Sequence, residues 1–247
     1  MTTTANKPSV VGSWNEQVIR LQNEWAAILE RRAQHKNERI ENRVTTWKAA
    51  VDSMQLEYEE LVAKGEWFRG PSDLLSIIGR PRYETYHSAM IAWLLDPLAR
   101  HMLGDRFLRA FLVACNTDWA FDKALLATPT ITCEETRDNC RADIIFRVSG
   151  FTLVIENKVD ASEGDTQCDR LFNAFNKDED AYFLFLTPTG RRPRTATGEA
   201  AEAFCTLSYS QLRSCLKSAL DNSSNLAASV GRATAINYLT TLMKDFR

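Results

Sequence analysis

Three charged residues in the second half of the chain, Asp143, Glu156 and Lys158, are spaced so that they could act together. Two converging carboxylates repel each other, so their pairing must be offset by something that binds them. Carboxylate oxygens are preferred ligands of a hard divalent cation, and a lysine beside that cation can orient or deprotonate a water molecule and steady a phosphate. The set therefore predicts hydrolysis of phosphodiester bonds. The alternative is that all three are ordinary polar residues at strand ends.

A predicted hairpin would position these residues. Segments 141–148 and 151–158 have the composition of strands, and the Ser-Gly pair between them predicts a two-residue turn. In that register the numbers of facing residues add up to 299, so Asp143 and Glu156 lie opposite each other with Cβ atoms ~5 Å apart. Period-two alternation puts Lys158 on the face of Glu156 and the apolar residues of the second strand on the other face.

The remainder of this half predicts an α/β domain. Helices are expected over 84–95, 105–114, 166–175, 210–220 and 234–246, and further strands over 130–135, 182–188 and 204–208. Strands that alternate with helices after an initial hairpin indicate a mixed sheet covered on both faces.

Apolar residues at helical spacing mark an N-terminal arm. One stripe runs through residues 18–28, and a second stripe from Ile40 to Leu61 restarts one residue out of phase. This phase slip indicates a break, a hairpin or a stutter in a long helix. Either the arm is two helices packed on their own domain, or the second stripe is the seam of a dimer.

We therefore expect three regions in the chain. Residues 1–10 form a disordered polar tail, residues 11–70 form the helical arm and candidate oligomerisation element, and residues 71–247 form the α/β domain. The boundary is placed where glycine and proline punctuate the sequence between the arm and the first helix of the domain.

The order of charged residues around the hairpin resembles the signature of the PD-(D/E)XK nuclease superfamily, which is an acid followed later by acid-x-Lys. Here the acid is Asp143, and the sequence Glu156-Asn157-Lys158 follows the hairpin turn. Flanking motifs are similar to one branch of that superfamily. They comprise Glu84 with His87-Ser88, the run from Ala92 to Pro97, Leu103-Gly104-Asp105 with Phe107-Leu108, Gln167, and the strand Phe185 to Pro188 with Gly190. The resemblance covers roughly residues 82 to 211. Ala142 replaces the name-giving proline, and Leu171 stands where a tyrosine often accompanies the glutamine.

The resemblance implies a restriction-endonuclease-like α/β fold, in which a mixed sheet is flanked by helices, and a Mg²⁺-dependent nuclease in which Mn²⁺ can replace Mg²⁺. The implied catalytic residues are Asp143, Glu156 and Lys158. The implied metal ligands are Asp143, Glu156, the Asn157 carbonyl and, from the first helix, Glu84. Lys158 would position the attacking water.

Four further residues are candidates for binding substrate. The resemblance implies a role for Gln167 on the helix after the core strands. Arg141 faces Lys158 in the hairpin register and is suited to clamp a phosphate. Arg191 and Arg192 follow a strand end and are suited to contact phosphates. The alternative is that these arginines flank a strand and a solvated loop.

Composition limits the partners. Thirty Lys and Arg against 32 Asp and Glu leave a net charge of -2, which argues against a protein that coats nucleic acid or membranes through bulk charge. The six scattered cysteines predict free thiols in a reducing cytosol. No apolar run approaches the ~18 residues of a membrane span, and no secretory signal is evident, so we expect a cytoplasmic protein.

The sequence thus predicts a nuclease that acts on nucleic acid, DNA in preference to RNA, and a homo-oligomer formed through the arm. One alternative is a non-catalytic nucleic-acid-binding or assembly subunit that keeps the nuclease fold. Another is a nuclease of a defence or mobile-element complex that is active only with a protein partner.

Overall fold

The computed structural model describes residues 10–115, 128–223 and 229–246. Residue contacts divide the chain into two units, Met1–Arg69 and Gly70–Arg247, which we describe separately. The predicted tail over residues 1–9 lies outside the described residues, and Val10 is already helical.

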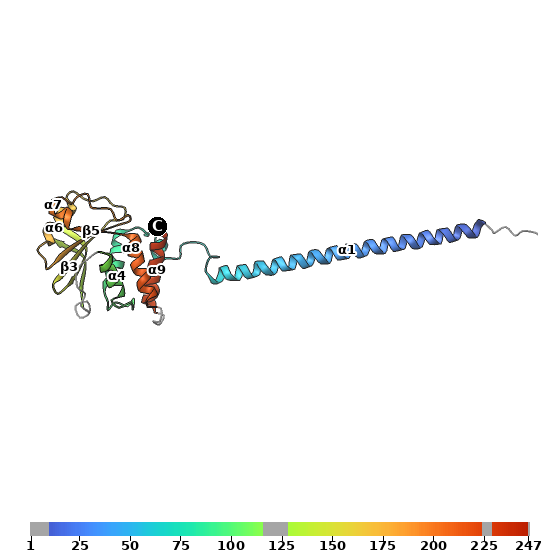
Figure 1. The fold of residues 1–247 in the computed structure, drawn as a ribbon, viewed down its shortest axis with the longest axis horizontal. Helices are drawn as coiled ribbons and strands as arrows, with labels where there is room; N and C mark the ends of the chain where they lie inside the picture. The colour runs from blue at the N-terminus through green and yellow to red at the C-terminus, as the bar shows by residue number, and fades with distance from the viewer. Residues whose placement is uncertain (1–9, 116–127, 224–228, 247) are drawn as a thin grey trace, which may run out of the picture. The chain divides into compact units, whose positions relative to one another are not determined.

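The first unit is dominated by helix α1, Val10–Ala63, a single helix of 54 residues (Figure 1). Of the interpretations left open for the phase slip, a stutter in a long helix is confirmed, and a break, a hairpin and two packed helices are wrong. The segment between the two stripes contains no glycine or proline and is rich in Glu, Arg, Lys and Gln, which all favour helix. Beyond its end, Gly65 has a positive φ of 73°, and Glu66 N–H donates to the Leu61 carbonyl, a Schellman arrangement. None of the described helices, α1 included, has an apolar stretch long enough to cross a membrane.

The second unit is built on a five-stranded sheet. Its strands, in spatial as well as sequence order, are β1 (Thr130–Arg137), β2 (Cys140–Val148), β3 (Phe151–Asn157), β4 (Ala181–Thr187) and β5 (Phe204–Ser208). Strands β1, β2 and β3 pair antiparallel, whereas β3, β4 and β5 pair parallel, so the predicted mixed sheet is confirmed. The hairpin register is also confirmed, because Val148 pairs with Phe151 and Ile144 with Ile155.

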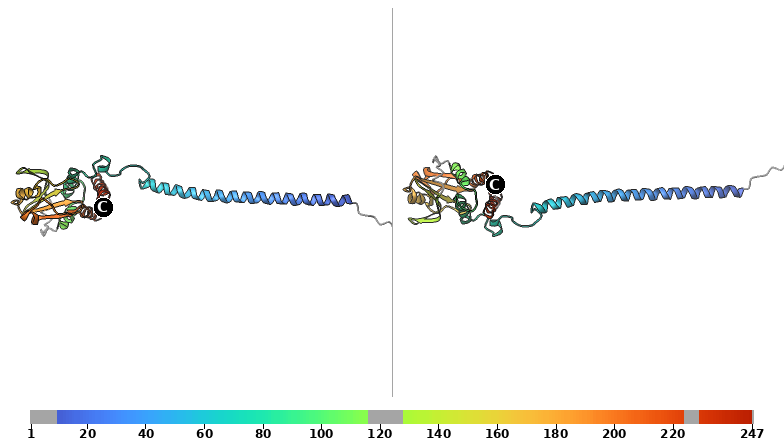
Figure 2. Two further views of the ribbon diagram at one scale, coloured as in Figure 1. Left: turned by 90° about the horizontal axis from the view of Figure 1, so that it is seen from above. Right: turned by 90° about the horizontal axis from the view of Figure 1, so that it is seen from below.

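Helices cover both faces of the sheet (Figures 1 and 2). They are α2 (Leu74–Ile77), α3 (Glu84–Leu95), α4 (Arg106–Ala114), α6 (Gln167–Phe175), α7 (Gly198–Ala203), α8 (Tyr209–Asp221) and α9 (Val230–Asp245). Helices α3, α4, α8 and α9 pack with Leu153 and Ile155 in one apolar core. Helix α6 packs with Val154 and Phe185 in a second core on the opposite face. The sequence did not predict α2 and α7, which have only four and six residues.

The central strand β3 is buried along its whole length. Its first five residues are apolar apart from Thr152, and its last two are Glu156 and Asn157. Burial of a carboxylate and an amide is costly unless both are bound by partners. The end of β3 must therefore be surrounded by polar groups from neighbouring elements.

Candidate active site

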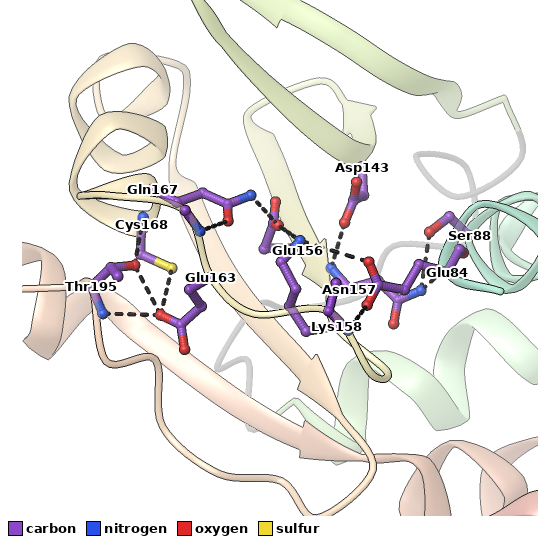
Figure 3. A network of polar contacts seen from close by, with 12 residues as sticks. Glu84, Ser88, Asp143, Glu156, Asn157, Lys158, Glu163, Gln167, Cys168 and Thr195 are labelled. Atoms are coloured by element: carbon purple, nitrogen blue, oxygen red, sulfur yellow. Dashed lines mark hydrogen bonds and ion pairs between the residues drawn. The ribbon is translucent and has the colours of Figure 1, made fainter. Parts of the chain in front are cut away.

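The polar groups around the end of β3 come from four elements (Figure 3). Asp143 lies on β2 one position beyond the last pair of the hairpin, and Glu84 is the first residue of α3. The backbone N–H of Asn157 donates to Asp143 Oδ2 over 2.8 Å. The three charged residues predicted from sequence are thus brought together with Glu84 at one end of the sheet.

Glu156 is fully buried and has two partners on one oxygen. Its Oε1 lies 2.6 Å from Lys158 Nζ and accepts a hydrogen bond from Gln167 Nε2 over 2.5 Å. Its Oε2 is buried and has no hydrogen-bond partner among the described residues. Burial, followed by the charge of Asp143, raises the pKa of Glu156 to about 8. The groups around Glu156 therefore do not fully offset the negative charge of its carboxylate form.

Lys158 is held as a cation. Burial lowers the pKa of its ammonium group, but Glu156, Asp143 and Glu84 together outweigh that effect and raise it. Its Nζ also lies 3.9 Å from Glu84 Oε2. Since the pKa is raised, Lys158 in this state donates hydrogen bonds and does not act as a base.

Glu84 connects α3 to the loop that follows β3. Its Oε1 accepts hydrogen bonds from the backbone N–H groups of Val159, at 2.8 Å, and Ala161, at 3.0 Å. A carboxylate at the first turn of a helix is also favoured by the helix dipole. Glu84 therefore fixes the path of the chain beyond Lys158 while its other oxygen faces the ammonium group.

The side chain of Asn157 lies in a buried network that the sequence did not predict. Its Nδ2 donates to Ser88 Oγ over 3.1 Å and to the Glu84 carbonyl over 3.2 Å. Its Oδ1 accepts a hydrogen bond from the hydroxyl of Tyr209 over 2.9 Å. The side chain at the middle position of the acid-x-Lys sequence thus joins β3 to α3 and α8. Ser88 stands in the quoted helix motif, whereas no local sequence signal pointed to Tyr209.

A polar hollow of about 310 Å³ opens above these residues. It is lined by Glu84, Thr85, Glu134, Asn139, Cys140, Arg141, Asp143, Lys158, Gln167 and Arg170. Burial raises the pKa of Asp143, although the N–H of Asn157 and the charge of Lys158 oppose this rise. Sequence analysis missed Arg170, which stands three residues after Gln167 on the same side of α6, a spacing that could have identified it.

The predicted substrate-binding arginines are in different environments. Arg141 is exposed, lines the hollow and lies 3.5 Å from Glu134. Arg191 is bound to the buried carboxylate of Glu163 at 2.5 Å and is not among the residues that line the hollow. Arg192 is exposed and donates to the Ala201 carbonyl over 3.4 Å. The structure therefore brings Arg141, and neither Arg191 nor Arg192, to the rim of the hollow.

The donor set at the end of β3 fits a hard cation with few protein ligands. Within the described ranges, no group of three or more His, Cys, Asp or Glu converges as a complete metal cage. Mg²⁺ does not need one, because it keeps several waters and usually takes one or two carboxylates together with substrate phosphates. The orphaned Oε2 of Glu156 and the half-buried carboxylate of Asp143 are donors of the required kind.

Comparison with known families places much of the chain in one superfamily. The family model described as PD-(D/E)XK nuclease superfamily matches residues 72–240, more than half of the chain. No curated protein and no solved structure matched the chain. The matched region contains the whole sheet and the residues of the polar hollow.

Proposed function

The chain belongs to the PD-(D/E)XK nuclease superfamily, and from this premise we propose that it is a Mg²⁺-dependent nuclease that cleaves phosphodiester bonds, in DNA rather than RNA. The observation that carries the proposal is the environment of Glu156. A fully buried carboxylate with a raised pKa, one orphaned oxygen and a lysine on the other is costly for the fold alone. Glu156 itself does not line the hollow, but its partners Lys158 and Gln167 do. Such perturbed groups beside a hollow are typical of functional sites.

The carboxylates of Asp143 and Glu156 and the backbone carbonyl of Asn157 would hold the metal, and Glu84 Oε2 would approach it from α3. Mn²⁺ is expected to substitute for Mg²⁺. When bound, the cation supplies neutralisation of the phosphate charge and a lowered pKa of water. These residues match the preference of Mg²⁺ for carboxylate and carbonyl oxygens.

The remaining roles belong to the chain's own side chains. Lys158, as an ammonium group, orients the attacking water and offsets charge on the phosphate. The water oxygen forms the new bond to phosphorus in line with the bond to the leaving oxygen, which breaks. The attacking water releases its proton to solvent, and the leaving oxygen takes up a proton from solvent. Gln167 fixes Glu156 Oε1 through its amide, and the hydrogen bond that Gly164 N–H donates to Gln167 Oε1 holds that amide in turn.

Cations at the rim of the hollow would bind the substrate. Arg141 and Arg170 both line the hollow, where a phosphate approaching Lys158 would pass them. We retain Arg191 and Arg192 as weaker candidates, because Arg191 is bound to Glu163. The free state of all six cysteines supports a reducing, cytoplasmic location.

We assign assembly to α1. The side chains of its second stripe are exposed, with Val44 at 55%, Val51 at 60% and Met54 at 68%. A continuous apolar face of this kind needs a partner, and a second copy of the chain is the commonest one. A homodimer would bring two sites to one duplex. Action within a defence or mobile-element complex, with a protein partner, is a further proposal for the same helix.

The test is incubation of the purified full chain with plasmid, linear duplex DNA and RNA, each in Mg²⁺, Mn²⁺ or EDTA. We expect cleavage of DNA in both metals and none in EDTA. Cleavage that continues in EDTA, or that is equal in the Asp143→Ala variant, would contradict the proposal. Failure of the parent to cleave any of the three substrates would favour the non-catalytic binding subunit.

A further inference from the structure

The charges of α1 are segregated along its length. The basic segment, which we define as residues 31–43, carries five Arg or Lys against two Glu, a net charge of +3. The rest of α1 carries two cations against seven acids, a net charge of -5. The chain as a whole is acidic, with a net charge of -2, so this concentration of cations is not a consequence of composition.

The cations of the basic segment share one side of the helix. They surround a shallow hollow that is lined by Arg31, Arg32, His35, Lys36, Arg39 and Arg43, together with Ile28 and Ile40. Neither glutamate of the segment lines it. On a helix with ~3.6 residues per turn, these positions form a band along the axis. Glu41 is turned away from the band, whereas Glu38 lies at its edge, 3.7 Å from His35.

Among the residues of this band, only His35 has an ion-pair partner in the described part of the chain, Glu38 at 3.7 Å. Arg32, Lys36 and Arg39 make no ion pair with any described residue, and Arg31 donates only to the Ala27 carbonyl within the helix. Arg43 lies over the ring of Trp47 and keeps its charge. Like charges at helical spacing destabilise a helix. The segment therefore keeps an arrangement that costs stability unless an anion covers it.

We propose that the basic segment of α1 binds the phosphate backbone of nucleic acid, outside the cleavage site. This inference rests on the proposed nuclease function and adds to it a second substrate-binding surface. The segment spans ~18 Å at ~1.5 Å per residue. Duplex DNA presents one charge per ~1.7 Å, so ~10 phosphates lie within that span. Four of the five cations are arginines, whose fork binds phosphate oxygens in pairs.

The catalytic unit needs such an anchor. Gly70–Arg247 contains 20 Arg or Lys against 22 Asp or Glu, a net charge of -2. The rim of its polar hollow also carries Glu84, Glu134 and Asp143. Attraction of a polyanion by this unit is therefore weak, because phosphate contacts supply most non-specific binding energy.

A second copy of the chain is a poorer occupant of this band. Arg32 and Arg39 continue the seven-residue repeat of Val18 and Trp25. Two parallel helices paired along that repeat would place arginines against arginines at the seam, which opposes association there. The apolar stripe from Ile40 to Leu61 remains available to a partner helix while the basic segment faces nucleic acid.

The experiment uses the full chain with Lys158→Ala, which slows cleavage, and a fluorescent 30-base-pair DNA duplex. Anisotropy is measured between 50 and 300 mM NaCl in the absence of divalent metal. The test variant adds Arg32→Gln, Lys36→Gln and Arg39→Gln. The matched control adds Arg20→Gln, Lys48→Gln and Lys64→Gln, which remove the same charge outside the segment. Circular dichroism checks the helix content of both.

We expect the test variant to bind at least about tenfold more weakly at 100 mM salt, with a salt slope smaller by about 2.7, because each lost phosphate contact removes ~0.9. The control should keep the parent's slope. A third variant, Arg32→Lys with Arg39→Lys, preserves charge and should retain most of the binding, which excludes a folding defect as the cause.

Equal salt slopes for the test variant and the control would overturn the proposal, as would a test variant that changes only the mass of the assembly. This failure is distinguishable from failure of the proposed function. If binding depends on the basic segment but the parent cleaves no substrate, the proposed binding surface stands and the proposed nuclease function is contradicted. If the parent cleaves DNA but binding does not depend on the segment, the nuclease function stands and the binding proposal is contradicted.

Discussion

The hydroxyl of Tyr209 donates a hydrogen bond over 2.9 Å to Asn157 Oδ1, although the two residues are 52 positions apart. Tyr209 begins α8 and is fully buried, and Asn157 ends β3. Because the Asn157 amide also donates to the Glu84 carbonyl and to Ser88 Oγ of α3, this contact helps to place Glu84 beside the site.

We expect Tyr209→Phe to lower the free energy of unfolding by about 1–3 kcal/mol, because it leaves a buried amide oxygen without its donor. Cleavage should slow as α3 loses its fixed position. Urea unfolding measures the first effect, and Tyr83→Phe, at an exposed tyrosine, is the control. A variant with unchanged stability would show that the network does not hold the site together.

The three proposed catalytic residues should respond differently to truncation. Asp143→Ala and Glu156→Ala should abolish cleavage, while the metal-free fold keeps or gains stability because a buried carboxylate is removed. Lys158→Ala should retain metal binding and lose rate by roughly 10²-fold or more. Cleavage assays and calorimetry with Mn²⁺ provide the measurements, with the exposed Lys217→Ala as control. If all three variants cut as well as the parent, the site is wrongly assigned.

Gln167 is expected to act through Glu156. Gln167→Glu would place a second carboxylate at the position of the amide that now donates over 2.5 Å. The added repulsion should raise the pKa of Glu156 further, so the pH profile of cleavage should move to higher pH. Gln167→Ala should lower the rate with a smaller displacement of the profile, and Asn173→Ala, exposed on the same helix, should leave it unchanged. Identical profiles for all four proteins would contradict the role.

His87 should make stability depend on pH. Burial lowers the pKa of this histidine from 6.5 to about 4, and its ring lies between the Pro81 carbonyl and the Tyr238 hydroxyl. Between pH 6.5 and 4 the unfolded chain binds a proton that the folded chain does not, so stability falls as pH falls through this window. The loss approaches about 3 kcal/mol at pH 4.

Urea unfolding of the parent and of His87→Gln at pH 7 and pH 4.5 measures the effect of this histidine. The variant is less stable at pH 7 because two hydrogen bonds change, but its additional loss on acidification should be smaller than that of the parent. A parallel pH dependence in both proteins would show that His87 is protonated in the folded state.

The apolar stripe of α1 predicts self-association. Light scattering of the full chain should report a mass of at least two chains at micromolar concentration. Glu substitutions at Val44, Val51 and Met54 should shift the mass toward one chain, because charge in an apolar seam is unfavourable. Glu at Thr45, Ala49 and Ala63, on the opposite side of the helix, is the control. A parent with the mass of one chain would contradict the prediction.

Local sequence determined the hairpin. Two strand-like segments and a Ser-Gly turn fixed which residues face each other, because side chains alternate strictly along a strand and a two-residue turn leaves one register. The positions of Asp143, Glu156 and Lys158 followed from that register. The helices predicted over 84–95 and 166–175 were also evident in the sequence and correspond to α3 and α6. The first was indicated by its broad apolar face and by the Asp-Pro pair that follows it.

The sequence by itself did not show that α1 is unbroken. A phase slip in an apolar stripe is compatible with a turn or with a continuous helix on which the stripe changes side. The segment between the two stripes contains no glycine or proline, which favours the continuous helix. In the unit Gly70–Arg247, by contrast, only tertiary structure decided the environment of the candidate site. It brought Tyr209 to Asn157, bound Arg191 to Glu163 and left Glu156 Oε2 with no hydrogen-bond partner among the residues that the structure describes. Burial and long-range hydrogen bonds depend on how helices pack on both faces of the sheet, which residue spacing along the chain does not specify.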